Sequence, residues 1–211
     1  MSLEIRWFFE GDVPDAVRRW FEGLAGGLAS PVKQKKEERT DTYLVTQDKN
    51  VGVKLREEKL EIKWRTGHRR FSATGEKVSG QAEDWCKRTW SDKGKTPAEK
   101  TGETVTHEAG FPWVDVKKVR RQCKLALAEG KLVPVEGWAE QAFLVELTSL
   151  SLRRKSWWSL GVDVLADEKE AMQSLRQGAE ALFADYSGPD LDTGNSYGYP
   201  EWIWQQCKVE S

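Results

Sequence analysis

Basic and apolar residues alternate along the stretch VGVKLREEKLEIKWR, between Val51 and Arg65. Alternate side chains of a strand point to opposite faces, so Lys54 and Arg56 share one face and apolar side chains fill the other. After a short turn, Lys63 and Arg65 repeat the pattern. Basic side chains gathered on one face suit phosphate, which a guanidinium binds through two donors at once. The stretch therefore predicts a β-hairpin whose charged face lies either in water or inside a barrel.

The charge of the whole chain is nearly balanced, with 33 Lys and Arg against 34 Asp and Glu among 211 residues. Such a chain has no overall field that would draw it to DNA or to a membrane, so any attraction for anions must be local. It contains no run of about eighteen apolar residues, and its first residues lack the features of a secretory signal. We expect a single domain over residues 1–211 that is soluble and cytoplasmic and does not bind a membrane.

Cysteine and histidine give little signal for chemistry. Cys86, Cys123 and Cys207 are odd in number and widely spaced, which supports neither a disulfide framework nor a zinc site. We expect buried free thiols. The two histidines, His68 and His107, lie in polar segments and only weakly suggest a histidine base.

The remaining patterns predict strands with two substantial helices. One helix follows Asp12 as N-cap and runs to Leu24, and the other begins at Asp167 and continues to Tyr186. Residues 91–106 are predicted to form a long loop, and EWIWQQ a short final element. About seven or eight antiparallel strands can close into a barrel, which removes the sheet edges. The predicted strands are 3–9, 32–45, the two in 51–65, 82–90, 113–127, 142–152 and 157–166.

Several of these segments, in this order, resemble the CYTH superfamily, also called triphosphate tunnel metalloenzymes. The matching pieces are EIRWFF, RTDTYLV, VGVKLREEKLEIKWR, VKKVR, FLVELTSL and WWSLGVD, and they cover most of the chain. The resemblance implies an α+β fold built on a closed antiparallel β-barrel of about eight strands with flanking helices. It also implies a tunnel that binds a triphosphate with basic side chains and holds Mg²⁺ or Mn²⁺ with acidic ones.

The same resemblance assigns candidate roles to individual residues. The phosphate-binding positions are matched by Lys54, Arg56, Lys63, Arg65, Lys118 and Arg120. The strands in which the family places metal ligands carry Glu4, Glu146 and Asp163, and oxygen ligands of this kind suit Mg²⁺. Glu146 is the most specific signal, because apolar residues flank its carboxylate. Pairing of Glu146 with a tunnel arginine is an equal alternative.

The first strand departs from the family's ExExK pattern, because the same register reads Glu4-Ile5-Arg6-Trp7-Phe8 here. Arg6 replaces the second glutamate and Phe8 replaces the lysine. A guanidinium in place of a carboxylate puts a cation where the metal ion should sit, which should weaken metal binding. In this position Arg6 can bind phosphate directly.

Two functional hypotheses follow, and the sequence supports them almost equally. The first is a tunnel that binds triphosphate, inorganic polyphosphate or another phosphorylated small molecule, with metal-dependent hydrolysis of the terminal phosphate left open. The second is a non-catalytic member of the fold that binds a polyanion or a protein partner and has lost its metal site. The changes at Arg6 and Phe8 support the second. Nucleic-acid binding through the lysine-rich residues 87–100 is the weakest reading, because the net charge is near zero and no basic stripe is present.

Overall fold

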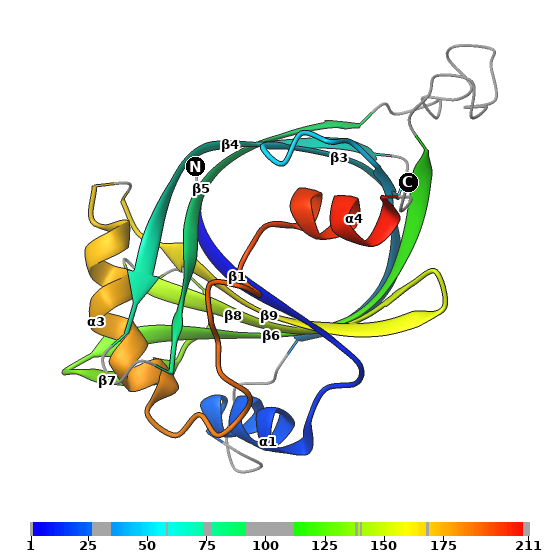
Figure 1. Ribbon diagram of the computed structural model, residues 1–211. Coiled ribbons are helices and arrows are strands. Elements are labelled where there is room, and N and C mark those ends of the chain that lie inside the picture. Colours follow the sequence, from blue (N-terminus) through cyan, green and yellow to red (C-terminus); the bar gives the residue numbers. More distant parts are fainter. Residues whose placement is uncertain are drawn as a thin grey trace.

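The computed structural model describes residues 2–26, 35–57, 59–73, 77–91, 112–137, 139, 141–167 and 169–208. These residues form nine strands and three helices (Figure 1). The helices are α1 (Asp15–Leu24), α3 (Ala171–Phe183) and α4 (Tyr199–Cys207). The strands are β1 (Ser2–Glu10), β2 (Lys35–Leu44), β3 (Val51–Arg56), β4 (Lys59–Ser72), β5 (Ser79–Ser91), β6 (Trp113–Ala128), β7 (Lys131–Pro134), β8 (Ala142–Leu152) and β9 (Lys155–Leu165).

Eight of the strands close into an antiparallel barrel. Their order is β2-β3-β4-β5-β1-β9-β8-β6. The ring closes because β6 also pairs with β2, in a ladder that begins with Lys35 opposite Gln122 and ends with Leu44 opposite Trp113. Closure satisfies the backbone groups that an open sheet would leave at its edges. The short strand β7 lies outside the ring and pairs with β6 alone. The prediction of a closed antiparallel barrel with flanking helices is therefore confirmed.

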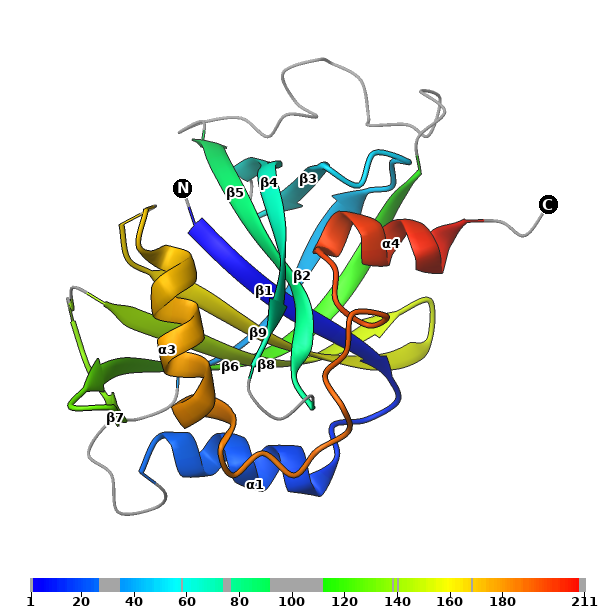
Figure 2. The ribbon, with the colours of Figure 1, turned by 60° about the vertical axis from the view of Figure 1, so that its left-hand side comes forward.

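One hydrophobic core lies between the outer barrel wall and two helices. Along β1, Leu3, Ile5 and Trp7 face outward and are almost fully buried against residues of α1 and α3. Figure 2 shows both helices on the same side of the barrel. The intervening side chains of β1 face inward, as the two-residue period of a strand requires.

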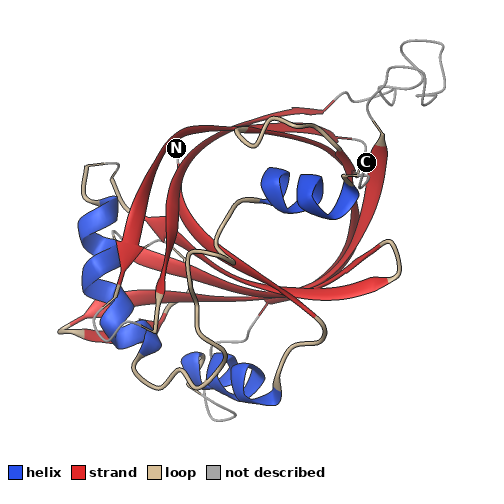
Figure 3. Cartoon of the chain, viewed as in Figure 1, coloured by secondary structure: helices blue, strands red, loops and turns tan. Residues whose placement is uncertain are grey.

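A second hydrophobic core lies inside the barrel, around α4 (Figure 3). Phe8 is 1% exposed and stacks on Tyr197 and Trp202, with ring centroids 5.5 and 4.9 Å apart. Ile203 of α4 and Val116 of β6 belong to the same cluster. The interior is thus divided into an aromatic half filled by α4 and a charged half. From the sequence we expected EWIWQQ to be a short element but could not place it inside the barrel.

Local boundaries differ from the prediction in a few places. Helix α1 begins at Asp15, with Pro14 at its N-cap in an extended conformation that excludes earlier residues from the helix. Strand β4 continues to Ser72 through an irregularity between Arg65 and Gly67, where its exposed polar side chains hide the strand period. Of the predicted 91–106 loop, all but Ser91 lies outside the described residues, as does His107. No described helix is long and apolar enough to cross a membrane.

Candidate functional site

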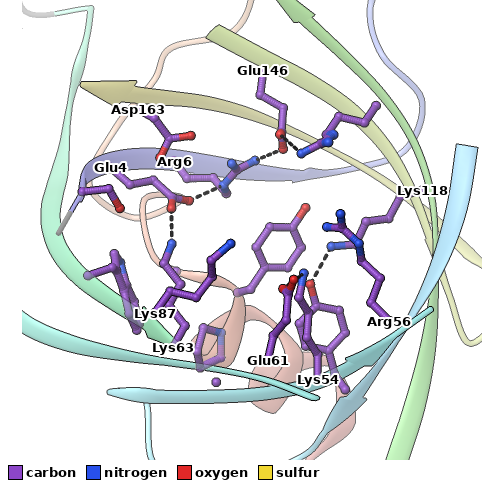
Figure 4. Close-up of a pocket in the computed structure, with 18 of the residues that line it drawn as sticks. Glu4, Arg6, Lys54, Arg56, Glu61, Lys63, Lys87, Lys118, Glu146 and Asp163 are labelled. Carbon is purple, nitrogen blue, oxygen red and sulfur yellow. Dashed lines mark hydrogen bonds and ion pairs between the residues drawn. The ribbon is translucent and has the colours of Figure 1, made fainter. Parts of the chain in front are cut away.

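The charged half of the barrel interior contains a cavity of about 280 Å³ (Figure 4). Eight basic side chains line it: Arg6, Arg39, Lys54, Arg56, Lys63, Lys87, Lys118 and Arg120. Four acidic side chains line it as well: Glu4, Glu61, Glu146 and Asp163. They come from strands all around the barrel, so cations face one another across the cavity. The lining favours an anionic ligand.

The structure brings together all but one of the residues that the sequence singled out. Arg65 is the exception, because it does not line the cavity. Its guanidinium forms an ion pair with Glu83 and donates a hydrogen bond to Asn50 Oδ1 at 2.7 Å. Sequence reasoning missed Arg39 and Tyr43 of β2. Their signal was the alternation of Glu37, Arg39, Asp41 and Tyr43, which puts all four side chains on one face of the strand.

A series of ion pairs crosses the barrel interior from β4 to β6. Lys63 of β4 forms an ion pair with Glu4 of β1. Arg6 Nε donates to Glu4 Oε1 at 2.8 Å, and its Nη1 donates to Glu146 Oε1 at 2.9 Å. Arg120 Nη1 of β6 donates to Glu146 Oε2 at 3.2 Å. Burial would raise the pKa of Glu4, but Lys63 and Arg6 hold it well below its usual range.

The series continues on β2, the neighbour of β6. Arg120 forms a further ion pair with Glu37. Arg39 forms two ion pairs on this strand: its Nη1 atom lies 2.6 Å from Glu37 Oε1, and its Nε atom lies 3.1 Å from Asp41 Oδ1. Successive inward-facing residues of one strand, two positions apart, can pair in this way because their side chains lie on the same face.

Asp41 is fully buried and leads the series back to β4. It contacts Lys118 Nζ at 3.1 Å and Lys54 Nζ at 3.4 Å, and Lys54 also pairs with Glu61 at 2.9 Å. Glu61 belongs to the same strand as Lys63, where the series begins, so the ion pairs run around the whole barrel wall. Burial would raise the pKa of Asp41, but Lys118 and Lys54, with Arg39, lower it to about 2.

Lys118 lies where the charged half meets the aromatic half. Its Nζ is 3.8 Å from the centroid of the Tyr199 ring and donates a hydrogen bond to Tyr43 Oη at 2.6 Å. Burial lowers the pKa of Lys118 to about 8, against the opposing effect of Asp41. This lysine therefore loses its charge at a lower pH than an exposed lysine would.

Two cations and one carboxyl group lie outside the series of ion pairs. Arg56 and Lys87 line the cavity and form no ion pair with another described side chain, although their charges help to lower the pKa of Glu61. Asp163 lies opposite Glu4 across the β1–β9 ladder. Burial, and then the charge of Glu4, raise the pKa of Asp163 to about 7. Part of the negative charge of the cavity wall is therefore neutralised near pH 7.

The carboxylates do not fit the divalent ion that the resemblance implies. Glu4 and Glu146 are both occupied by Arg6, which lies between them. Among the described residues, no group of three or more Asp, Glu, His or Cys has an arrangement that could hold a metal ion. The assignment of Glu4, Glu146 and Asp163 as metal ligands stays a prediction, and the position of Arg6 counts against it.

Comparisons with known proteins agree with the fold. No protein-family model matches the chain, and no curated protein sequence does so significantly. The mimivirus capping enzyme triphosphatase is similar in structure, with a TM-score of 0.55 and 11% identity over 88% of this chain and 90% of that chain. A second structure, the RNA triphosphatase domain of a trifunctional mimivirus mRNA capping enzyme, gives a TM-score of 0.52 and 10% identity over 89% and 88% of the two chains. Structural similarity at such a low sequence identity shows the fold alone. The resemblance to triphosphate tunnel proteins is therefore confirmed for the fold.

Proposed function

We propose that this chain binds triphosphate, inorganic polyphosphate or another polyphosphate-bearing small molecule in the charged half of its barrel. The observation that carries the proposal is the excess of basic over acidic side chains around one cavity. Like charges held in a confined space repel, and a polyanion relieves this repulsion at several positions at once. A cavity of about 280 Å³ is at the small end of the range for ligand sites, which suits a phosphate chain.

The cations without a described ion-pair partner indicate where a ligand would bind most favourably. Lys87 and Lys63 are neighbours across the β4–β5 ladder, and Arg56 projects into the cavity from β3 (Figure 4). Binding to Arg56 and Lys87 costs no existing ion pair among the described residues, whereas binding to the remaining cations competes with their carboxylates. We therefore expect the phosphate chain to bind most favourably at Arg56 and Lys87.

Metal-dependent hydrolysis of a terminal phosphate, with Mg²⁺ or Mn²⁺, is the second candidate function. Two observations favour it: Glu4, Glu146 and Asp163 lie on one cavity wall, and both mimivirus structures with this fold are described as the triphosphatase of a capping enzyme. The pairing of Arg6 with two of these carboxylates favours binding without hydrolysis instead. A phosphate-release assay with tripolyphosphate and either metal separates the two. Metal-dependent release that disappears in Glu146→Gln would establish the second candidate.

Titration calorimetry with tripolyphosphate in EDTA tests the binding proposal. Lys87→Glu should weaken the affinity by about ten-fold or more, because it reverses a charge at the cavity that no described carboxylate pairs with. Arg88→Glu is the matched control, since Arg88 is the next residue of β5 and points to the opposite face. Its affinity should stay within about two-fold of wild type. Absence of heat and of any rise in melting temperature with tripolyphosphate would refute the proposal and leave the protein-binding alternative.

A further inference from the structure

We infer that Arg6 takes the place of a divalent cation between Glu4 and Glu146, so that this barrel holds its anion without a metal ion. The statement about the anion rests on the proposed function, whereas the statement about the cation site does not. The residues around Arg6 carry the inference, because they form a site that is shaped for a guanidinium.

Two carboxylates and a hydroxyl group bind the guanidinium of Arg6. The side chain is 5% exposed. Its Nε and Nη1 atoms donate to Glu4 and Glu146 at 2.8 and 2.9 Å, and Nη1 also lies 3.2 Å from Ser159 Oγ. Burial would lower the pKa of Arg6, but Glu146 and Glu4 hold it well above its usual range. The group is therefore charged at every pH at which the protein is folded, and it cannot leave as a neutral species.

Strand β9, which lies between the strands of the two carboxylates, has a glycine beside Arg6. Arg6, Gly161 and Glu146 form a row across β1, β9 and β8. A Cβ atom at position 161 would lie 2.5 Å from Arg6 Nη2 and 2.6 Å from Cζ. The missing side chain lets the guanidinium lie flat over β9 and reach from β1 to the carboxylate on β8.

A residue of α4 also lies close to the guanidinium. Arg6 Cζ lies 5.1 Å from the centroid of the Tyr199 ring, a distance at which the ring attracts a cation. The guanidinium therefore contacts the backbone of β9 at Gly161, the ring of Tyr199 and the carboxylates of Glu4 and Glu146. The carboxylates would suit either kind of cation, but the open position at Gly161 and the ring face of Tyr199 suit a planar guanidinium, and a ring face supplies no ligand for Mg²⁺ or Mn²⁺.

A metal ion and Arg6 cannot share the two carboxylates. An ion bound to Glu4 Oε1 or Glu146 Oε1 would lie at roughly 2.1 Å from that oxygen atom, within the space that the guanidinium occupies. The second oxygen atoms of the two carboxylates are taken by Lys63 and by Arg120. The resident arginine neutralises the carboxylates as the ion would, but it offers no open position at which a water molecule could be activated. This arrangement supports binding of the phosphate chain and not its hydrolysis.

Manganese titration, followed by the electron paramagnetic resonance signal of free Mn²⁺, tests the cation site directly. The wild-type chain should bind no stoichiometric Mn²⁺ with a dissociation constant below roughly 1 mM. Arg6→Gln removes the charge at similar length and should bind stoichiometric Mn²⁺ with a dissociation constant of about 0.1 mM or lower, ten-fold below that limit, while Arg6→Lys should still exclude the ion. Arg121→Gln is the matched control, because Arg121 is paired with Glu22 on the outside of the barrel.

Calorimetry with tripolyphosphate tests the consequence for the anion. The wild-type affinity in EDTA should equal that in excess Mg²⁺ within about two-fold, after correction for the Mg²⁺ complex that tripolyphosphate forms in solution. Stoichiometric Mn²⁺ binding by the wild type, or tripolyphosphate binding that needs a metal, would overturn the inference. If tripolyphosphate binds under neither condition, the proposed function fails, and the Mn²⁺ titration of the wild type still decides whether Arg6 occupies the cation site.

Discussion

Gly161 lies directly beneath the guanidinium of Arg6, and a Cβ atom in its place would be 2.5 Å from Nη2. A glycine inside a strand usually weakens it, and its presence often marks a close approach of another group. Here the approaching group is the side chain that joins β1 to Glu146 on β8. The two residues are therefore coupled: Arg6 keeps its contacts only while position 161 has no side chain.

Gly161→Ala should destabilise the protein although it adds only one methyl group. The methyl group meets the guanidinium of Arg6, which its ion pairs with Glu4 and Glu146 hold in place. It forces Arg6 away from Glu146, so we expect a loss of about 1–3 kcal/mol in the free energy of unfolding. Urea unfolding followed by circular dichroism measures this change.

Gly23→Ala provides the matched control. A Cβ atom at Gly23, in α1, would meet nothing within 4 Å. Replacement of an exposed helical glycine should leave stability unchanged or raise it by up to about 1 kcal/mol. Equal effects of the two substitutions would contradict the coupling between Gly161 and Arg6.

Phe8→Lys restores the residue type of the family pattern and should nevertheless be strongly destabilising. Phe8 is 1% exposed between Tyr197 and Trp202, so a lysine there would lose the aromatic stacking and bury a charge. We expect a loss of about 3–5 kcal/mol in the free energy of unfolding. A double variant that restores the family pattern, with Arg6→Glu and Phe8→Lys, must therefore be shown to fold before its hydrolytic activity is interpreted.

Thermal and urea unfolding check this expectation, with Phe8→Leu as the control. Leucine keeps the position apolar and should cost less than about 2 kcal/mol. A Phe8→Lys chain as stable as Phe8→Leu would mean that α4 does not depend on this contact and can move away from the charged half of the barrel.

The sequence predicted the charged wall of the cavity because strand periodicity is local. In the hairpin of β3 and β4, the two-residue period places Lys54, Arg56 and Lys63 on one face whatever the rest of the chain does. A closed barrel then turns that face inward. Arg65 obeys the same period, but Glu83 on the neighbouring strand holds it away from the cavity.

The sequence could not predict relationships that depend on register. Arg6 reaches Glu146 only because β9 lies between their strands and places Gly161 in the same row. Nothing local to any of the three segments specifies that row. The position of α4 was equally out of reach, since Trp202 and Ile203 would give the same apolar pattern on the outside of a barrel as within it.

Lys118 should make the binding of tripolyphosphate depend on pH. Its pKa is lowered to about 8, chiefly by burial among Tyr43, Tyr199 and the strands around them, while Asp41 opposes the shift. The charged form is lost as the pH rises through about 8. The affinity for tripolyphosphate should therefore fall by roughly three- to ten-fold between pH 7 and pH 9 through this group.

Comparison with Lys118→Met isolates this effect, because the ionisation of tripolyphosphate itself contributes equally to both proteins. The variant should bind more weakly than wild type at pH 7, and the two affinities should converge by pH 9. Lys117→Met is the matched control, since Lys117 is exposed on the opposite face of β6 and its loss should leave the ratio to wild type constant across the range. A constant ratio for Lys118→Met as well would show that Lys118 does not change its charge between these pH values, and that Asp41 outweighs the burial of its ammonium group.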